Sequence, residues 1–268
     1  MALRDVTLGQ YFPGSSLLHR LDPRTKILFT LFFIVALFLC KFLVSYGLLV
    51  LLLIVGVQSS GIKYSVFRKG LQPVAFIVVF TALLNMFYTP GTPIVSFWIF
   101  HLTEAGIWKA FFMVLRIMML IISTLLLTYT TSPLLLTDGM EQLMKPLKAL
   151  KVPVHELSMM MSIALRFIPT LIQETDKIIS AQKARGADFE SGTLIQRAKS
   201  LIPILIPLFI SAFRRAEDLA VAMECRCYHG DQGRTRLRQL VYRSADYVFL
   251  AFGPLLCVGI GVLRYFGL

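Results

Sequence analysis

The sequence is poor in charged residues. Asp, Glu, Lys and Arg together make up 16% of the 268 residues, whereas soluble domains carry about a quarter. Hydrophobic residues reach 56%, and the mean hydropathy is +0.72. This composition excludes an ordinary soluble domain. It predicts an integral membrane protein whose main contact is the lipid bilayer.

Acidic residues are scarcer than basic ones, 15 against 27, so the formal net charge is +12. The Lys and Arg residues avoid the longest apolar runs and gather in a few connecting regions. Such clusters are typical of the cytoplasmic loops of membrane proteins. The basic charge therefore points to membrane topology, and we expect no nucleic-acid partner.

Patterns that indicate chemistry are also missing. The four histidines show no H-E-x-x-H spacing, and no G-x-x-x-x-G-K-[ST] phosphate loop is present. Cys225, Cys227 and His229 form a C-x-C-x-H cluster, but it supplies at most three zinc ligands. Cys40 and Cys257 lie in apolar runs, which argues against a disulfide framework. We expect no catalytic residue, no cofactor and no metal site, so the chain is not predicted to be an enzyme.

Apolar runs divide the chain. The first 26 residues contain no apolar core, so no cleavable signal peptide is expected. Lys41 interrupts a run too long for one span, which favours two short spans joined by a tight turn. Five spans are predicted, at about 27–40, 42–57, 71–89, 110–131 and 247–263. The basic stretch 59–70 is predicted to be a loop between the second and third spans.

Residues 133–245 are richer in charge than the apolar runs before them: they contain 16 Lys and Arg and 11 Asp and Glu among amphipathic stretches. Apolar spacing predicts three helices here, over about 134–150, 154–185 and 194–228, the last kinked at Pro203 and Pro207. The predicted fold is an all-α integral membrane protein with about five transmembrane helices and a cytoplasmic domain of about three. The predicted domains are 1–131, 132–245 and 246–268. The N-terminus and the insert are placed in the cytoplasm.

The insert contains a short internal repeat. AQKARGADFE (181–190) and AMECRCYHG (222–230) align at an offset of 41 residues. The offset pairs Arg185 with Arg226, each at a predicted helix end. Small residues flank both arginines: Ala184 and Gly186 in one copy, Cys225 and Cys227 in the other.

Two interpretations of these arginines stay open. A cation near a helix C-terminus interacts favourably with the helix dipole by about 0.3–1 kcal/mol, and Gly186 is an ordinary C-cap. Alternatively, small neighbours let each helix tip enter a groove, where the guanidinium forks onto a carboxylate. Two such tips would suit two similar sockets on a dimeric partner.

Two further features have an ordinary and a functional interpretation. Arg116 is the one charge near a long apolar span, and it is either a functional intramembrane charge or a side chain that snorkels to the interface. Met159, Met160 and Met161 form an unbroken run that either fills a core or provides an adaptable contact surface.

Three motifs together resemble one family. They are HRLDPRTKIL (19–28), ARG (184–186) and RAEDLAVAMECRCYHG (215–230). In this combination and span order, the chain resembles the transmembrane (T) component of energy-coupling factor type ABC vitamin transporters. The resemblance implies a non-catalytic scaffold in the plasma membrane of a prokaryote. Such a scaffold joins two ATP-binding cassette ATPase subunits to a small membrane substrate-binding (S) subunit, and its insert is a coupling domain.

The resemblance also implies residue roles. Arg185 with its neighbours Ala184 and Gly186 would dock in one ATPase, and Arg226 with Cys225 and Cys227 would dock in the other. The family often has Ala or Gly beside the arginine, so the two cysteines depart from its pattern but remain small. Met159–Met161 are candidate contacts with the S subunit.

A self-contained secondary transporter is the main alternative. It would place the substrate site within the five spans, but charged residues are almost absent there. Inverted span repeats, which are typical of such transporters, are not evident either. A membrane-embedded enzyme is disfavoured because no nucleophile, acid or metal set clusters in the sequence.

Overall fold

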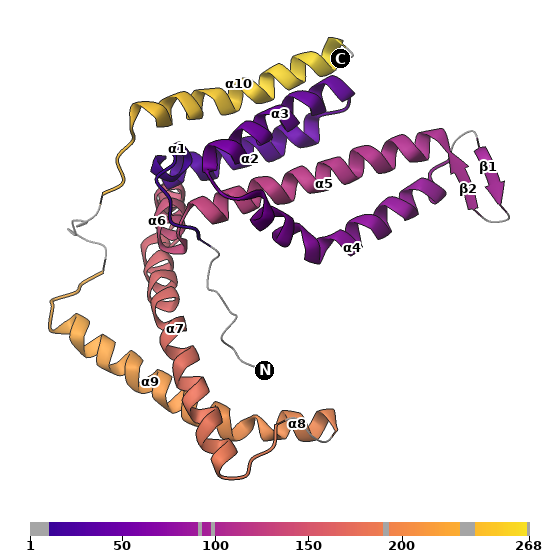
Figure 1. The fold of residues 1–268 in the computed structure, drawn as a ribbon. Coiled ribbons are helices and arrows are strands. Elements are labelled where there is room, and N and C mark those ends of the chain that lie inside the picture. The colour runs from indigo at the N-terminus through magenta and orange to yellow at the C-terminus, as the bar shows by residue number, and fades with distance from the viewer. Residues whose placement is uncertain (1–10, 91–92, 98–99, 190–192, 231–238, 267–268) are drawn as a thin grey trace. The chain divides into compact units, whose positions relative to one another are not determined.

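The computed structural model of the chain describes residues 11–90, 93–97, 100–189, 193–230 and 239–266 (Figure 1). Apart from one β-hairpin, the regular elements in these ranges are helices, which confirms the predicted all-α fold class. The chain divides into two compact units. We call Gly9–Gly139 with Leu240–Leu268 the membrane unit and Met140–Gln239 the insert unit.

The membrane unit contains most of the long apolar helices. In chain order its elements are α1 (Leu17–Arg20), α2 (Pro23–Leu39), α3 (Leu43–Ser60), α4 (Tyr64–Tyr88), β1 (Pro93–Phe97), β2 (Phe100–Thr103), α5 (Glu104–Thr130), the first half of α6 (Pro133–Met144), and α10 (Ser244–Phe266). Asp22 caps α2 by accepting from the Arg24 backbone N–H at 2.9 Å, and Pro23 stands at the first helical position. β1 and β2 pair antiparallel between α4 and α5.

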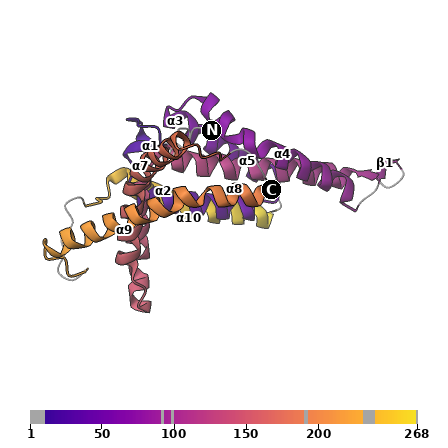
Figure 2. The ribbon, with the colours of Figure 1, turned by 90° about the horizontal axis from the view of Figure 1, so that it is seen from below.

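The core of this unit lies where α2, α3, α5 and α10 meet. α10 packs along α2, and α4 packs along α5 (Figures 1 and 2). The side chains buried in the core are Phe33, Ala36, Leu37, Cys40, Tyr46, Leu49, Leu53, Met119, Leu256 and Ile260. They come from two helices that are neighbours in sequence, α2 and α3, and from the distant helices α5 and α10, so these apolar runs form one bundle.

Five stretches in the described residues are long and apolar enough to cross a membrane, the number that the sequence predicts. The set of five differs from the predicted spans in two helices. α2, predicted as the first span, has only 17 residues, or about 25 Å at 1.5 Å per residue. Ile195–Glu224 meets the length and hydropathy requirement although it was assigned to the cytoplasmic insert. Where the membrane begins and ends along the chain stays a prediction.

The loop predicted over 59–70 is wrong in extent. α3 continues to Ser60, and α4 already begins at Tyr64, so Arg68 and Lys69 lie in its first two turns. Gly61 ends α3 in the left-handed region, with φ of 70°. Basic residues next to an apolar run therefore did not mark the end of helical structure.

The insert unit contains the rest of α6, a 3₁₀ helix (Lys145–Leu150), α7 (Val154–Ala184), α8 (Leu194–Ser200) and α9 (Ile202–Glu224). The helix predicted over 194–228 is therefore divided at Leu201, and Pro203 stands in the first turn of α9. The first turn of a helix tolerates proline, because a backbone N–H at that position would have no partner within the helix. Pro207 stays inside α9, where the sequence places a kink.

Candidate functional site

The first arginine motif closes α7. Ala184 is the last helical residue, and Arg185 follows it as the C-cap. The Gly186 N–H donates to the Lys183 carbonyl at 3.0 Å, and the next N–H, of residue 187, donates to the Gln182 carbonyl at 3.0 Å. Gly186 has φ of 84°, in the left-handed region. These two bonds define a Schellman C-cap, in which glycine is the usual left-handed residue.

The second arginine motif closes α9 in the same way. The Cys227 N–H donates to the Glu224 carbonyl at 2.9 Å, and the Tyr228 N–H donates to the Met223 carbonyl at 3.1 Å. Cys227 has φ of 54°, so a cysteine occupies the left-handed position that glycine holds in the first motif. Arg226 precedes it, as Arg185 precedes Gly186.

The sequence repeat therefore extends to backbone geometry. Every donor and acceptor of the second cap lies 41 residues after its counterpart in the first. Both arginines are exposed, and in the described part of the chain neither guanidinium has a hydrogen-bond or ion-pair partner. The small neighbours are exposed too: Ala184, Gly186, Cys225 and Cys227. The C-cap interpretation is correct for the backbone, and both side chains are available for binding.

A polar contact that the sequence reasoning missed joins α7 to α9. A Glu174 carboxylate oxygen accepts from the Ser211 hydroxyl, and the other accepts from Arg215 Nη2 at 2.8 Å. Glu174 and Arg215 are themselves 41 residues apart, so they hold equivalent positions in the repeat. The sequence contained a signal for this contact, because the 41-residue offset of the repeat aligns an acidic residue, Glu174, with a basic one, Arg215.

This contact lowers the pKa of Glu174. The main cause is the hydrogen bond from the Ser211 hydroxyl, and the positive charges of Arg215 and Lys177 add to it. Partial burial opposes the shift but does not cancel it. The carboxylate is therefore held in its charged form where the two helices meet.

The two arginines lie at the same distance along their helices from the Glu174–Arg215 contact. Arg185 follows Glu174 by eleven residues, and Arg226 follows Arg215 by eleven residues. At 1.5 Å per residue, each arginine stands about 16 Å beyond the contact along its own helix. Figure 1 shows α7 and α9 crossing within the insert unit. The unit thus presents two matching arginine tips at equal helical distance from one contact.

The methionine run lies near the start of α7. Met160 and Met161 are exposed, by 55% and 54%, and Met159 is partly buried. Leu157 is also exposed. Exposed neighbours of this size do not fill a core in the chain by itself, so the run is available as a contact surface.

Arg116 makes structural hydrogen bonds that neither interpretation of the sequence included. Its Nη2 and Nε donate to the Tyr46 hydroxyl at 2.6 and 3.1 Å, and Nη2 also lies 3.4 Å from the Cys40 carbonyl oxygen. Cys40 is the C-cap of α2 and Tyr46 lies in the first turn of α3. The arginine therefore holds the turn between α2 and α3 and is partly buried there.

The HRLDPRTKIL motif is part of a second polar network, within the membrane unit. Asp246 is fully buried and accepts from the backbone N–H groups of Asp22 at 2.8 Å and Arg243 at 2.7 Å. Arg24 pairs with Asp22 at 2.8 Å and donates to the Leu240 carbonyl at 3.1 Å. Its guanidinium carbon also lies 3.7 Å from the centroid of the Tyr242 ring. The network ties the start of α2 to the segment that leads into α10.

The C-x-C-x-H cluster does not assemble as a ligand set. His229 Nδ1 lies 2.8 Å from the Cys227 backbone carbonyl oxygen. Within the ranges that the structure describes, no three His, Cys, Asp or Glu side chains lie close enough together to hold a metal ion.

Comparisons with known proteins place the whole chain among membrane transport components. The family described as cobalt transport protein (CbiQ) matches residues 14–237. Three relatives bear the name energy-coupling factor transporter transmembrane protein EcfT. They are from Ruminiclostridium cellulolyticum (56% identical, covering 91% of each chain), Thermosediminibacter oceani (53%, covering 98% of this chain and 99% of the relative) and Bacillus subtilis (51%, covering 90% and 91%).

Proposed function

Because the chain belongs to the CbiQ and EcfT family of transporter transmembrane components, we propose that it joins two ABC ATPase subunits to a small membrane S subunit. It is a multi-pass membrane protein, and no catalytic role falls to it. In this proposal, nucleotide-driven motion of the ATPase pair moves α7 and α9 and drives substrate uptake. A vitamin is the substrate class that we propose, and its identity resides in the S subunit.

The two arginine tips support the ATPase-docking part of this proposal most directly. They share one backbone geometry, one spacing from the Glu174–Arg215 contact, and small exposed neighbours. An ABC ATPase pair offers two similar grooves, so two similar tips fit it better than one large surface would. Arg185 docks in one ATPase and Arg226 in the other, each guanidinium forking onto a carboxylate of the groove.

The first prediction concerns the tips. The double variant Arg185→Glu with Arg226→Glu is expected to reduce capture of the ATPases to background while membrane insertion is kept. Removing one partner of a buried, hydrogen-bonded charge pair weakens binding by about 2–5 kcal/mol, and here both charges are reversed. The measurement is co-purification of the ATPases with the tagged membrane chain.

The matched control reverses two other exposed arginines of the same unit, Arg197 on α8 and Arg214 on α9. Arg197→Glu with Arg214→Glu changes the net charge equally and should retain the ATPases. Capture at wild-type yield by the Arg185 and Arg226 double variant would show that docking lies elsewhere.

We place the insert unit in the cytoplasm, where ATP-hydrolysing subunits reside, and the chain in a prokaryotic plasma membrane. In a chain whose four native cysteines are replaced by serine, single cysteines near positions 185 and 226 should react in intact cells only with thiol reagents that cross the membrane. Labelling by an impermeant reagent from outside would contradict this orientation.

Contact with the S subunit is assigned to the methionine run of α7. Met is unbranched and polarisable, and such surfaces repack against different partners. Met160→Asp with Met161→Asp should release the S subunit and leave the ATPases bound, since these side chains lie at the opposite end of α7 from Arg185. Loss of both partners together would indicate misfolding of the insert unit instead.

A further inference from the structure

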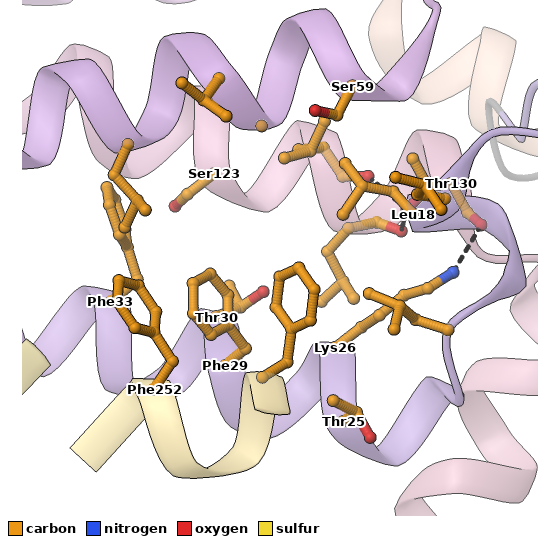
Figure 3. Close-up of a pocket in the computed structure, with 18 of the residues that line it drawn as sticks. Leu18, Thr25, Lys26, Phe29, Thr30, Phe33, Ser59, Ser123, Thr130 and Phe252 are labelled. Carbon is orange, nitrogen blue, oxygen red and sulfur yellow. Dashed lines mark hydrogen bonds between the residues drawn. The ribbon is translucent and has the colours of Figure 1, made fainter. Parts of the chain in front are cut away.

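A cavity of about 350 Å³ lies within the membrane unit, lined by α1, α2, α3, α5 and α10 (Figure 3). Its volume falls in the range of roughly 300–1,000 Å³ that is typical of small-molecule sites. Phe29, Phe33 and Phe252 form one side, and Gly56 and Leu126 contribute from α3 and α5. Nothing in the docking proposal uses this space.

The wall of the cavity offers water few hydrogen bonds. The Ser123 hydroxyl donates to the Leu120 carbonyl of its own helix at 2.9 Å, and the Thr130 hydroxyl donates to the Leu126 carbonyl at 2.8 Å. These two hydroxyls are satisfied within their own helix, whereas the hydroxyl of the lining residue Thr25 is buried without a hydrogen-bond partner among the described residues. A buried water needs two to four polar partners, so hydrocarbon is a better occupant than water.

One end of the cavity has an unused donor. Only 7% of Lys26 is exposed, and its Nζ donates to the Thr130 carbonyl at 2.9 Å (Figure 3). The same Nζ donates to the Thr131 hydroxyl at 3.1 Å. An ammonium has three N–H donors, and the third has no partner among the described residues. The carboxylates of Asp22 and Asp246 are engaged with Arg24 and with backbone N–H groups. An oxygen acceptor at this end would complete the set.

We propose that the cavity binds one acyl chain of a membrane lipid, with an ester or head-group oxygen of that lipid accepting from Lys26 Nζ. The chain follows the apolar wall from Lys26 towards Phe33, a rise of about 10 Å along α2 at 1.5 Å per residue. The lipid is the occupant within reach, because the helices that line the cavity belong to a membrane-spanning unit. The inference requires only membrane insertion and is independent of ATPase docking.

The test uses the full chain in complex with its partners, reconstituted in phosphatidylcholine vesicles. A minority of the phosphatidylcholine carries a diazirine in the middle of one acyl chain. After illumination, adducts are mapped by peptide mass spectrometry. We expect them to concentrate on cavity-lining residues of α2 and α10, and to persist when the remaining lipid is exchanged for detergent before illumination.

Gly56 offers a way to fill the cavity. A Cβ built there meets only Leu126 Cδ2, at 3.4 Å, so Gly56→Leu enters the space without a backbone clash. Gly47 lies on the same helix, and a Cβ there meets nothing within 4 Å. Gly56→Leu should lower the lining adducts several-fold, and Gly47→Leu should leave them unchanged. If Gly56→Leu fails to fold, Ala245→Phe fills the cavity from α10.

Lys26→Met tests the polar end. It should reduce retention of the photoreactive lipid through the detergent exchange about fivefold, the factor that corresponds to a net hydrogen bond of ~1 kcal/mol. Adducts spread evenly over the outer helix faces and insensitive to Gly56→Leu would overturn the proposal. Lining adducts that appear only after the S subunit has been removed would also overturn it, because the occupant in the complex would then be a protein side chain.

Discussion

At the residue scale, Cys225 and Cys227 illustrate how position decides the effect of a small side chain. Cys227 has φ of 54°, in the region where a side chain is strained, whereas Cys225 has φ of −59° and ψ of −23°, which are helical values. Glycine relieves the strain at the first kind of position and weakens a helix at the second. The two cysteines flank one arginine but should therefore respond oppositely to the same substitution.

We predict that Cys227→Gly stabilises the end of α9, because the left-handed conformation costs a residue with a Cβ about 1–2 kcal/mol. We also predict that Cys225→Gly destabilises it, because glycine at a helical position costs about 0.5–1 kcal/mol. The measurement is hydrogen exchange of the backbone amides in the last turn of α9. Cys227→Val, with a branched side chain at positive φ, should weaken both this cap and ATPase capture. Equal effects of glycine at both positions would contradict the left-handed cap.

Arg116 is explained at the same scale as a structural clamp. Arg116→Leu leaves the Tyr46 hydroxyl, in a residue that is 1% exposed, without its donor, and an unpaired buried polar group costs about 1–3 kcal/mol. Tyr46→Phe with Arg116→Leu should recover part of that loss, so the two substitutions should not be additive. Thermal unfolding of the purified complex measures this. Transport lost at unchanged thermal stability would instead favour a functional charge.

At the element scale, the contact between α7 and α9 depends on pH through Glu174. Its pKa is lower in the folded protein than in the unfolded chain, chiefly because Ser211 donates to the carboxylate. The charged form therefore stabilises the pairing at pH values above the ordinary glutamate pKa. This stabilisation is lost as pH falls through the lowered pKa.

We predict that the distance between spin labels on α7 and α9 broadens on acidification of the wild type. The distribution in Glu174→Gln should be nearly independent of pH, because the amide does not titrate. The reversed pair Glu174→Arg with Arg215→Glu should restore much of the wild-type distribution, whereas either single reversal should not. An acid response in Glu174→Gln equal to that of the wild type would assign the titration to another group.

Some of these elements could be predicted from the sequence, and the reasons differ. Apolar runs located α3, α4, α5 and α10, because a membrane helix is defined by its own composition. The 41-residue repeat predicted that Arg185 and Arg226 hold equivalent positions, and the two Schellman caps confirm this. The break at Leu201 was missed because a proline tolerated in the first turn of a helix resembles one that kinks its middle. Glu174–Arg215 and the cavity arise from packing between distant segments, which periodicity does not encode.

At the scale of the whole molecule, the insert returns to the membrane unit through the segment before α10. Leu240, Tyr242 and Arg243 contact the network of Arg24, Asp22 and Asp246. This network anchors the returning segment to the start of α2, next to the core of the bundle. In the proposed transport cycle, motion of α9 that passes along the chain to the membrane unit enters at this anchor, which we therefore propose as a coupling element.

The last prediction separates coupling from docking. Asp246→Ala removes the acceptor of the buried Asp22 N–H and of the part-buried Arg243 N–H, and a buried N–H left unpaired costs about 1–3 kcal/mol. We expect the reconstituted complex to retain its ATPases and to hydrolyse ATP while substrate uptake falls, because motion of α9 no longer reaches α2 and α10. Asp246→Asn keeps one oxygen acceptor and should show an intermediate ratio of uptake to hydrolysis. If hydrolysis and uptake decline together in both variants, the network stabilises the fold but does not transmit motion.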